Sequence, residues 1–365
     1  MSRTAIDGLH ALLRAPAAAS LPASLRASLV QAWEAADADH ARRAPWPVIA
    51  DTLQVLSRLD ADASALLAAL LFDLPGLRAA VAGELAASHP AVRGLLEGQD
   101  AADPVWALHA GREAGRNGEG LRRLLLAIIQ DLRVVPILLA RQLAKMRVAD
   151  RLPEAERRAL AQLTRDLHAP LANRLGIWQL KWELEDLAFR HLEPETWRRL
   201  ARELDESRAA RERYIEAVKK QLGRALAAQG IAAEISGRPK HIYSIWRKMQ
   251  KKQLPLDRLY DLRAVRVMVA DVAACYATLG VVHALWAPVP GEFDDYIARP
   301  KPNGYASLHT AVVGPEGRTL EVQVRTGEMH EQAELGVAAH WRYKETGGSA
   351  AGKGAGRAFE RKIAW

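Results

Sequence analysis

The first half of the chain carries a helical pattern of apolar positions. Up to about residue 200, apolar side chains recur at spacings of three and four residues, and Ala and Leu dominate. This spacing places apolar side chains on one face of a helix, so it predicts an all-helical region. One such face is formed by Leu121, Leu124, Leu125, Ile128, Ile129 and Leu132. Proline and glycine predict loops at 45–47, 75–76 and 115–120.

Charge-rich helices are expected to follow between about residues 154 and 229. The last of them ends at Gly230, a residue type that commonly terminates helices. Its apolar face consists of Ile215, Val218, Leu222, Ala225 and Leu226.

After Gly230 the pattern changes to short strands alternating with helices. The expected strands are 231–236, 262–269, 308–313 and 319–325, and the expected helices are 241–252, 271–286 and 328–342. Asp271 is expected to cap the helix that it precedes. The turn at 314–317 makes the last two strands a hairpin. The chain is therefore predicted to be α+β, with a small sheet flanked by helices after the all-helical half, and a flexible Gly-rich stretch at its end.

Composition narrows the class of protein. A chain of 365 residues with 49% hydrophobic residues is expected to form two or three globular units. The net charge of +8 favours an anionic partner such as a nucleotide or RNA, although solubility alone would explain it as well. With a single cysteine, Cys275, no internal disulfide is possible. We expect no signal peptide and no membrane span, and hence a cytoplasmic protein.

A basic helix preceded by a Gly/Pro turn is the first candidate binding element. In 237–248 the turn leads directly into the helix, so free backbone N–H groups and the positive end of the helix dipole meet at one point. Lys240, Ser244 and Lys248 recur at helical spacing and share a face. Such a face suits a polyphosphate, while a solvated surface helix is the alternative.

Two carboxylates form the second candidate element. Asp261 opens one expected strand, and Glu321 lies in another. In the second strand, Glu321, Gln323 and Arg325 alternate with apolar residues, a pattern that a merely solvated sheet face would also show. If the sheet brings Asp261 and Glu321 together, they suit Mg²⁺ beside bound phosphates.

A polar loop is the third candidate element. In 294–305, the ring of Tyr305 could stack on a purine, and Lys301 and Asn303 could meet phosphates or base edges. Half-buried packing is the alternative for Tyr305. The sequence contains no Walker-type phosphate loop, no Ser/His/Asp order and no Cys/His zinc pattern.

These segments together resemble the synthetase domain of RelA/SpoT long alarmone synthetases. The matching stretches are 237–249, 260–266, 290–310 and 321–341. The resemblance implies a nucleotidyltransferase-like fold with a small mixed sheet. It also implies that ATP donates its β,γ-pyrophosphate to the 3′-hydroxyl of GDP or GTP, which gives (p)ppGpp and AMP.

The resemblance also implies roles for individual residues. Asp261 and Glu321 would hold Mg²⁺, and Glu321 would also be the base. Gln323 would belong to the catalytic group and line the acceptor side. Arg238 and Arg266 would sandwich adenine. The remaining residues would bind substrates: Lys240, Ser244, Lys248 and Arg325 the ATP phosphates, Tyr305 the guanine ring, and Lys301, Asn303 and His309 the acceptor nucleotide.

An acidic segment distinguishes branches of this family. Glu292, Asp294 and Asp295 are similar to the acidic version found in synthetase-only members, whereas bifunctional members carry a basic pair. The resemblance implies a higher demand for Mg²⁺ and a shift of acceptor preference toward GDP.

The helical half resembles the family's HD-type hydrolase domain in a degenerate form. Phe72-Asp73 stands where that domain has an adjacent His-Asp pair that binds metal, and Trp46-Pro47 stands where another ligand His precedes a Pro. Asp150 fits a retained position. Since Phe and Trp remove the imidazole ligands, we expect no hydrolysis of the alarmone and a pseudo-hydrolase domain instead.

The resemblance divides the chain into a degenerate hydrolase domain (1–155), a helical linker (156–200), a synthetase domain (201–345) and a Gly-rich tail (346–365). Full-length relatives continue into a C-terminal regulatory region. Contacts with the ribosome and uncharged tRNA are expected only through that region, which this chain lacks.

Three rival hypotheses remain open. A bifunctional synthetase-hydrolase would need Mn²⁺-dependent loss of ppGpp. A non-catalytic RNA- or nucleotide-binding module would use the positive charge, but a carboxylate pair in its groove would repel phosphates. A nucleotidyltransferase would release pyrophosphate instead of AMP.

Overall fold

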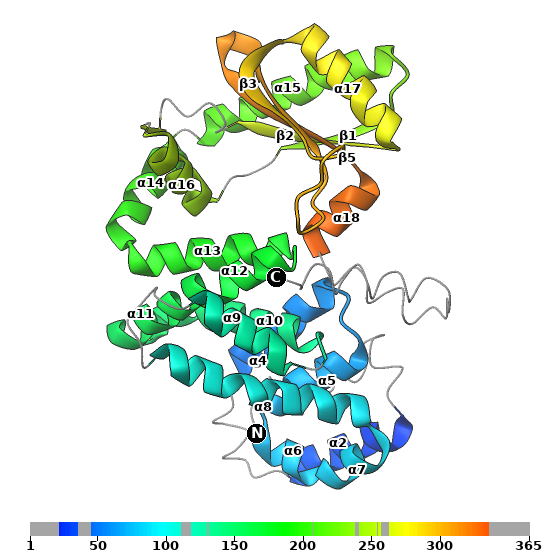
Figure 1. Cartoon of the computed structure of the whole chain (residues 1–365), viewed down its shortest axis with the longest axis vertical. Helices are drawn as coiled ribbons and strands as arrows, with labels where there is room; N and C mark the ends of the chain where they lie inside the picture. The colour runs from blue at the N-terminus through cyan, green and yellow to red at the C-terminus, as the bar shows by residue number, and fades with distance from the viewer. Residues whose placement is uncertain are drawn as a thin grey trace. The chain divides into compact units, whose positions relative to one another are not determined.

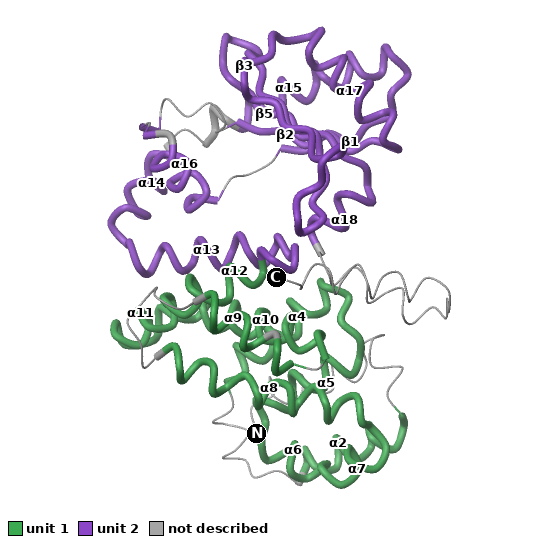
Figure 2. The backbone as a smooth tube through the Cα atoms, viewed as in Figure 1, with its two compact units in different colours: residues 1–172, 338–357 green, residues 173–337, 358–365 purple. Residues whose placement is uncertain are grey.

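The computed structural model of the chain describes residues 22–35, 45–110, 118–129, 131–206, 208–237, 241–253, 255–256 and 263–335. It divides into two compact units (Figure 2). Unit 1 comprises residues 1–172 and 338–357, and unit 2 comprises residues 173–337 and 358–365. The division falls inside the stretch expected to be a helical linker.

Unit 1 is helical throughout its described residues, as the apolar spacing predicts (Figure 1). Its helices are α2 (Ala23–Ala35), α4 (Trp46–Arg58), α5 (Ala63–Phe72), α6 (Pro75–Ala80), α7 (Ala82–Ser88), α8 (Pro90–Ala110), α9 (Gly118–Ile128), α10 (Val134–Arg147), η2 (Ala149–Arg151), α11 (Glu154–Leu163), the π-helical turn η3 (Thr164–His168) and α12 (Ala169–Arg174).

Helices α5 and α10 form the centre of unit 1. Nearly all their side chains are buried, because both are apolar around most of their circumference and pack among α4 and α8. Most described residues of the predicted loops are helical instead. Residues 46–47 and 75–76 lie in the first turns of α4 and α6, where proline is tolerated because its missing N–H would have no helical partner. Residues 118–120 begin α9, and residues 115–117 lie outside the described residues.

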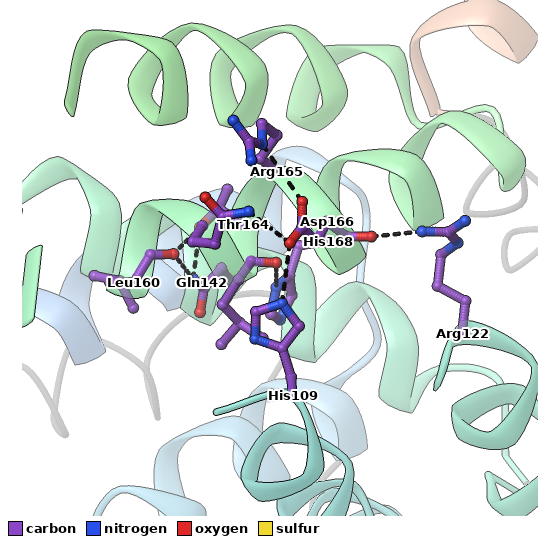
Figure 3. Close-up of polar contacts among 10 residues, drawn as sticks. His109, Arg122, Gln142, Leu160, Thr164, Arg165, Asp166 and His168 are labelled. Carbon is purple, nitrogen blue, oxygen red and sulfur yellow. Dashed lines mark hydrogen bonds and ion pairs between the residues drawn. The ribbon is translucent and has the colours of Figure 1, made fainter. Parts of the chain in front are cut away.

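A partly buried polar cluster joins α8, α9, α10 and η3 (Figure 3). Asp166 accepts hydrogen bonds from His109 Nε2 at 3.1 Å and from Gln162 Nε2 at 2.7 Å, and its backbone carbonyl accepts one from Arg122. Beside it, the imidazole of His168 is 3% exposed and stacks on Trp106. Burial lowers the pKa of His168 to about 3, although a hydrogen bond with the Leu163 carbonyl opposes the shift.

Unit 1 is therefore expected to lose stability on acidification. The folded state keeps His168 neutral, while the unfolded chain protonates it below about pH 6.5. The unfolded state thus binds more protons between about pH 6.5 and 3, so stability falls as pH drops through that window. From pH 7.5 to 5 the loss is about 2 kcal/mol. Amide hydrogen exchange along α10 measures it. His168→Phe keeps the stacking ring and should flatten this part of the pH dependence. An equal loss of stability in the wild type and the variant would contradict the attribution to His168.

Unit 2 contains a five-stranded mixed sheet with helices (Figure 1). Its elements are α13 (Trp178–Leu192), α14 (Pro194–Glu206), α15 (Arg208–Ala228), β1 (Ala233–Gly237), α16 (Ile242–Lys252), β2 (Ala264–Val269), α17 (Val272–Leu285), β3 (Ala287–Asp295), β4 (Leu308–Val313), η5 (Pro315–Gly317), β5 (Thr319–Thr326) and α18 (Gly327–Leu335). The strand order is β1-β2-β5-β4-β3, in which β2 and β5 are parallel and the other pairs antiparallel. The predicted fold class, α+β with a small mixed sheet flanked by helices, is confirmed.

One face of the sheet packs on α15 and α17 to form the core. Val218 and Leu222 of α15 meet Val265 of β2 and Val322 of β5, all fully buried. The predicted apolar face of α15 and the predicted hairpin β4–β5 are therefore confirmed. Asp271 caps α17, since its side chain accepts a 2.8 Å hydrogen bond from the Ala274 N–H.

Strand β3 is a strand that the sequence did not predict. Only its last two residues, Asp294 and Asp295, fell in the expected polar loop, and no element was expected for the residues before them. The strand contains Pro288, Pro290 and Gly291, residue types that are depleted in strands. An edge strand tolerates them because one side needs no ladder, and the register of β3 shifts between Pro288 and Phe293.

Two further expectations concern Cys275 and membrane spans. Cys275 is fully buried, as expected, and burial raises the pKa of its thiol to about 11. Among the described helices, none combines the length and apolar content needed to cross a bilayer.

Candidate active site

The centre of the sheet aligns two of the strands expected to carry chemistry. In the parallel pair β2–β5, Ala264 lies opposite Glu321 and Arg266 opposite Gln323. The Glu321 N–H donates a 2.9 Å hydrogen bond to the carbonyl of Arg263, just before β2. The expected partner carboxylate, Asp261, lies outside the described residues, as do Arg238 and Lys240.

The polar face of β5 is buried. Gln323 is 1% exposed and Arg325 2%, whereas Leu320 and Val324 point into the core on the other face. The alternative of a solvated sheet face is therefore wrong. Polar side chains held in a buried position must be hydrogen-bonded or paired, which gives them fixed orientations.

A line of polar groups crosses β5 and β4. The Glu321 carboxylate accepts a hydrogen bond from the Gln323 amide, and its Oε1 lies 3.8 Å from His309 Nδ1. The other ring nitrogen, His309 Nε2, lies 2.8 Å from the Tyr305 hydroxyl. His309 and Gln323 are direct neighbours in the β4–β5 register. The structure thus links a carboxylate to an aromatic ring through one imidazole.

Aromatic and cationic side chains gather around Tyr305. We call Tyr296, Lys301, Tyr305 and His309 the acceptor cluster. The Lys301 ammonium lies 4.2 Å from the ring centroid of Tyr296 and 5.3 Å from that of Tyr305. Trp178 of α13 meets the Tyr305 ring edge-on at 5.6 Å between centroids. Flat rings beside a fixed cation suit a nucleobase that carries phosphate groups.

Asn303 holds the loop of this cluster. Its side-chain oxygen accepts the Tyr305 N–H at 3.3 Å, and its amide donates to the carbonyl of Asn173 at 3.2 Å. The structure therefore brings together all four residues assigned to the acceptor nucleotide, with Asn303 in an anchoring position and Lys301, Tyr305 and His309 in contact.

Arg266 and Arg325 converge on a residue that the sequence did not single out. Both guanidinium groups lie 3.4 Å from Glu334 Oε1 on α18, and His330 Nδ1 lies 3.7 Å from the same oxygen. Burial lowers the pKa of His330, and the two arginines add to the shift. This corner of the sheet is rich in cationic groups, and the Glu334 carboxylate lies among them.

Helix α16 carries Ser244 and Lys248 and packs against α13 and α14 (Figure 1). Asp186 of α13 accepts a 2.9 Å hydrogen bond from the Tyr243 N–H, in the first turn of α16. Trp182 of α13 stacks on His241, the residue before the helix. The ATP-side residues that are described thus divide between two places, the sheet with α18 and this helix.

Sequence reasoning missed four contributors: Tyr296, Trp178, Asp186 and Glu334. Tyr296 could have been found, because it lies in the same loop as Tyr305 and directly follows two aspartates. The other three lie on helices, where nothing in the local pattern distinguishes them from surface or packing residues.

The side chains at Glu321 fit a hard divalent cation. Its carboxylate oxygens are the ligands that such an ion prefers, and the Gln323 amide N–H already donates a hydrogen bond to one of them, Oε1. Within the described residues, no group of three or more His, Cys, Asp or Glu side chains has metal-binding geometry. A complete ligand set would therefore need a contribution from Asp261 or from bound phosphates.

In unit 1, the position at which an HD-type domain would hold a metal ion, around Asp73, does not fit one. Asp73 accepts a 3.1 Å hydrogen bond from Arg141 Nε, and the Arg141 guanidinium also donates to the Gln99 side chain and lies 4.1 Å above the ring of Phe72. Arg141 and Asp73 side chains are 6% and 14% exposed. Asp150 is exposed on η2. A fixed positive charge at Asp73 opposes the binding of a cation there.

Comparisons with known proteins find two family models, which match separate parts of the chain. Residues 237–348 match the family model described as a region found in RelA / SpoT proteins, and residues 30–178 match the model of the HD domain. Proteins of both families use divalent metal ions.

Relatives are similar over most of the chain. A GTP pyrophosphokinase of Escherichia coli (strain K12) is 48% identical over 319 residues, 86% of this chain and 42% of the relative. One from Haemophilus influenzae is 45% identical over 318 residues, with the same coverage. The chain thus spans less than half the length of these relatives. A solved structure, the small alarmone synthetase 1 from Bacillus subtilis, superposes with a TM-score of 0.34 at 23% identity, covering 44% of this chain and 88% of that one.

Proposed function

Because the chain belongs to the RelA/SpoT family, we propose that it transfers the β,γ-pyrophosphate of ATP to the 3′-hydroxyl of GDP or GTP, forming ppGpp or pppGpp and AMP. The proposal draws on the relatives named GTP pyrophosphokinase, which are similar along both units. The structural observation that carries it is the line Tyr305–His309–Glu321, which joins an aromatic platform to a carboxylate.

In the proposed reaction, the guanine base stacks on Tyr305, and Lys301 meets the phosphates of the acceptor. The nucleotide's 3′-oxygen then attacks the β-phosphorus of ATP. Glu321 accepts the proton of that hydroxyl, the bond between the β-phosphorus and the α,β-bridging oxygen breaks, and AMP leaves. His309 orients the carboxylate from one side, and Gln323 fixes it from the other by donating a hydrogen bond.

The donor nucleotide would be bound by cationic side chains. Arg266 and Arg325 lie at the sheet beside α18, and Ser244 and Lys248 lie on α16. We assign adenine to Arg266 together with Arg238, and the phosphates to Arg325, Ser244, Lys248 and Lys240.

We propose Mg²⁺ as the divalent cation, held by Glu321 and Asp261. When bound, it would neutralise charge on the transferring phosphates. The register supports this assignment, because β2 begins opposite Glu321 and Asp261 precedes β2 by three residues.

Unit 1 is proposed to lack alarmone hydrolysis. The Arg141–Asp73 ion pair supports this, since the guanidinium already neutralises the carboxylate that would bind metal. We therefore propose that residues 1–155 form a pseudo-hydrolase domain and residues 201–345 the synthetase domain of a cytoplasmic protein.

A direct assay tests the proposed function. Purified chain is incubated with Mg²⁺, labelled ATP and either GDP or GTP, and the products are separated chromatographically. We expect ppGpp or pppGpp with equimolar AMP, and a loss of at least about 100-fold in Asp261→Asn. Asp257→Asn removes the same charge four residues earlier and serves as the matched control.

Other outcomes would contradict the proposal. Pyrophosphate release in place of AMP would identify a nucleotidyltransferase. Loss of added ppGpp in the presence of Mn²⁺ would identify a bifunctional enzyme. Salt-dependent RNA binding with no turnover of ATP would indicate a binding module.

A further inference from the structure

Two neighbouring carboxylates of the acidic segment, Asp294 and Asp295, lie on opposite faces of the sheet. Strand β3 pairs antiparallel with β4, so residues directly opposite each other share a face of the sheet. Asp294 lies opposite His309, and Asp295 lies opposite Leu308. His309 belongs to the face that carries Glu321, whereas Leu308 is fully buried in the core beneath α17. Asp294 therefore faces the candidate active site, and Asp295 faces α17.

Three hydrogen-bond donors occupy the Asp295 carboxylate. Its Oδ1 accepts the backbone N–H groups of Ile297 at 3.0 Å and Ala298 at 2.8 Å. Its Oδ2 accepts the hydroxyl of Tyr276 on α17 at 2.9 Å. The backbone carbonyl of Asp295 also accepts the Arg299 N–H at 3.3 Å. A side chain that closes a turn in this way acts as a cap.

The pKa of Asp295 is consistent with this engagement. Partial desolvation opposes ionisation, but the hydrogen bonds from Ala298, Tyr276 and Ile297 outweigh it and hold the pKa below its ordinary value.

The capped turn begins at Tyr296, a member of the acceptor cluster. The Tyr296 N–H donates to the carbonyl of Ser307 at 3.0 Å, and its ring meets His309 edge-on at 5.3 Å between centroids. Lys301 lies over the same ring. The conformation of 296–298 therefore determines the position of the Tyr296 ring in the acceptor cluster, although Asp295 itself lies on the opposite face of the sheet.

We propose that Asp295, braced by Tyr276, is a positioning residue that holds the turn 296–298 and thereby sets the affinity for the acceptor nucleotide. The inference rests on the proposed function and deepens it. It also revises the expected role of this residue. A carboxylate on the α17 face cannot share a cation with Glu321, so any contribution of the acidic segment to the Mg²⁺ demand comes from Glu292 or Asp294 and not from Asp295.

Two substitutions separate the cap from the charge. Asp295→Asn removes the charge but keeps an oxygen that accepts both N–H groups, and Asn caps about as well as Asp. Asp295→Ala removes both. A turn that forms only part of the time weakens binding in proportion to its population. We expect Asp295→Ala to raise the KM for GDP or GTP about tenfold while the KM for ATP changes less than about twofold. In Asp295→Asn both KM values should stay near those of the wild type.

Matched variants test the rest of the inference. Tyr276→Phe removes the brace alone and should raise the acceptor KM about threefold. Asp62→Ala removes an aspartate cap of the same kind from α5 in unit 1, where Asp62 accepts the Ala65 N–H at 2.7 Å, and should leave the acceptor KM unchanged. In a titration with Mg²⁺, a shifted half-saturation is expected for Asp294→Asn but not for Asp295→Asn. An equal rise of the acceptor KM in Asp295→Asn and Asp295→Ala would overturn the inference.

Amide hydrogen exchange provides a readout that needs no activity. The N–H groups of Ile297 and Ala298 should exchange faster in Asp295→Ala and as in the wild type in Asp295→Asn. Unchanged exchange in Asp295→Ala would overturn the brace. If the exchange follows the expectation but the wild type forms no (p)ppGpp, the proposed function fails and the brace stands.

Discussion

Replacing Glu321 by glutamine is expected to slow formation of (p)ppGpp by about 100- to 10,000-fold, the range over which loss of a general base acts. The substitution keeps the shape of the side chain and an oxygen that can accept the Gln323 hydrogen bond. It removes the negative charge and the ability to take a proton. The rate is measured as single turnover with saturating ATP and acceptor, so that binding changes do not enter.

The control for this prediction lies in the connection that joins β4 to β5. Glu316 sits in η5, where its side chain is 64% exposed and pairs with Arg318. Glu316→Gln removes one carboxylate from the same hairpin without touching the polar face of β5, so its rate should stay within about twofold of wild type. A Glu321→Gln protein with more than a tenth of the wild-type rate would exclude Glu321 as the base.

The two roles proposed for Glu321 are separable. If its main role is to hold Mg²⁺, a higher Mg²⁺ concentration should recover much of the rate of Glu321→Gln. If its main role is to accept the proton, the rate should stay low at every Mg²⁺ concentration. Either result identifies Glu321 as part of the machinery and specifies what it does there.

Local sequence patterns predicted the parts of unit 2 that depend on local rules. The alternation of apolar and polar residues predicted both strands of the hairpin, and β4 begins and ends where the pattern does. The N-cap preference of aspartate predicted the start of α17. Each of these features depends on residues close together in the sequence, so a short window is enough to show them.

Strand β3 and the direction of its carboxylates could not be predicted in the same way. The prolines of β3 are tolerated only because the strand lies at the edge of the sheet, and its position in the sheet is a property of the whole domain. Adjacent residues of a strand point to opposite faces, so Asp294 and Asp295 serve different environments although the sequence presents them as a pair. Which one faces the candidate active site depends on the register with β4.

The residues that contact the predicted site residues could not be predicted from the sequence for a similar reason. Glu334 contacts Arg266 and Arg325 only because β2 and β5 are neighbours, an arrangement that brings together residues about 60 positions apart. Trp178 and Asp186 come from α13, a helix whose sequence reads as an ordinary amphipathic segment. Long-range contacts of this kind leave no local signal.

In unit 1, the sequence predicted the loss of a metal ligand at Phe72 but not the ion pair that Asp73 forms. Phe72 in place of an imidazole could be read from the sequence, but the partner that Asp73 then acquires could not. Arg141 supplies that partner from α10, and burial lowers the pKa of its guanidinium while the Asp73 carboxylate opposes the shift. The Arg141 guanidinium thus stabilises the half-buried Asp73 carboxylate, which also interacts electrostatically with Lys145.

Arg141→Met is accordingly expected to destabilise unit 1 by about 3–5 kcal/mol. The variant leaves Asp73 without its guanidinium and removes a hydrogen bond from Gln99, whose side chain is fully buried. Amide hydrogen exchange of α5 and α8 measures the loss, because these helices flank the ion pair and report on unit 1 alone.

Arg147→Met provides the matched control on the same helix. Arg147 pairs with Asp51 at 2.6 Å, but the two side chains are 26% and 21% exposed, so solvent screens the pair and the loss should not exceed about 1 kcal/mol. Combining Arg141→Met with Asp73→Asn removes both charges and should recover a large part of the stability, since neutral groups no longer need compensation. If the double variant were as unstable as Arg141→Met, packing of the arginine side chain rather than charge compensation would be what holds this part of unit 1 together.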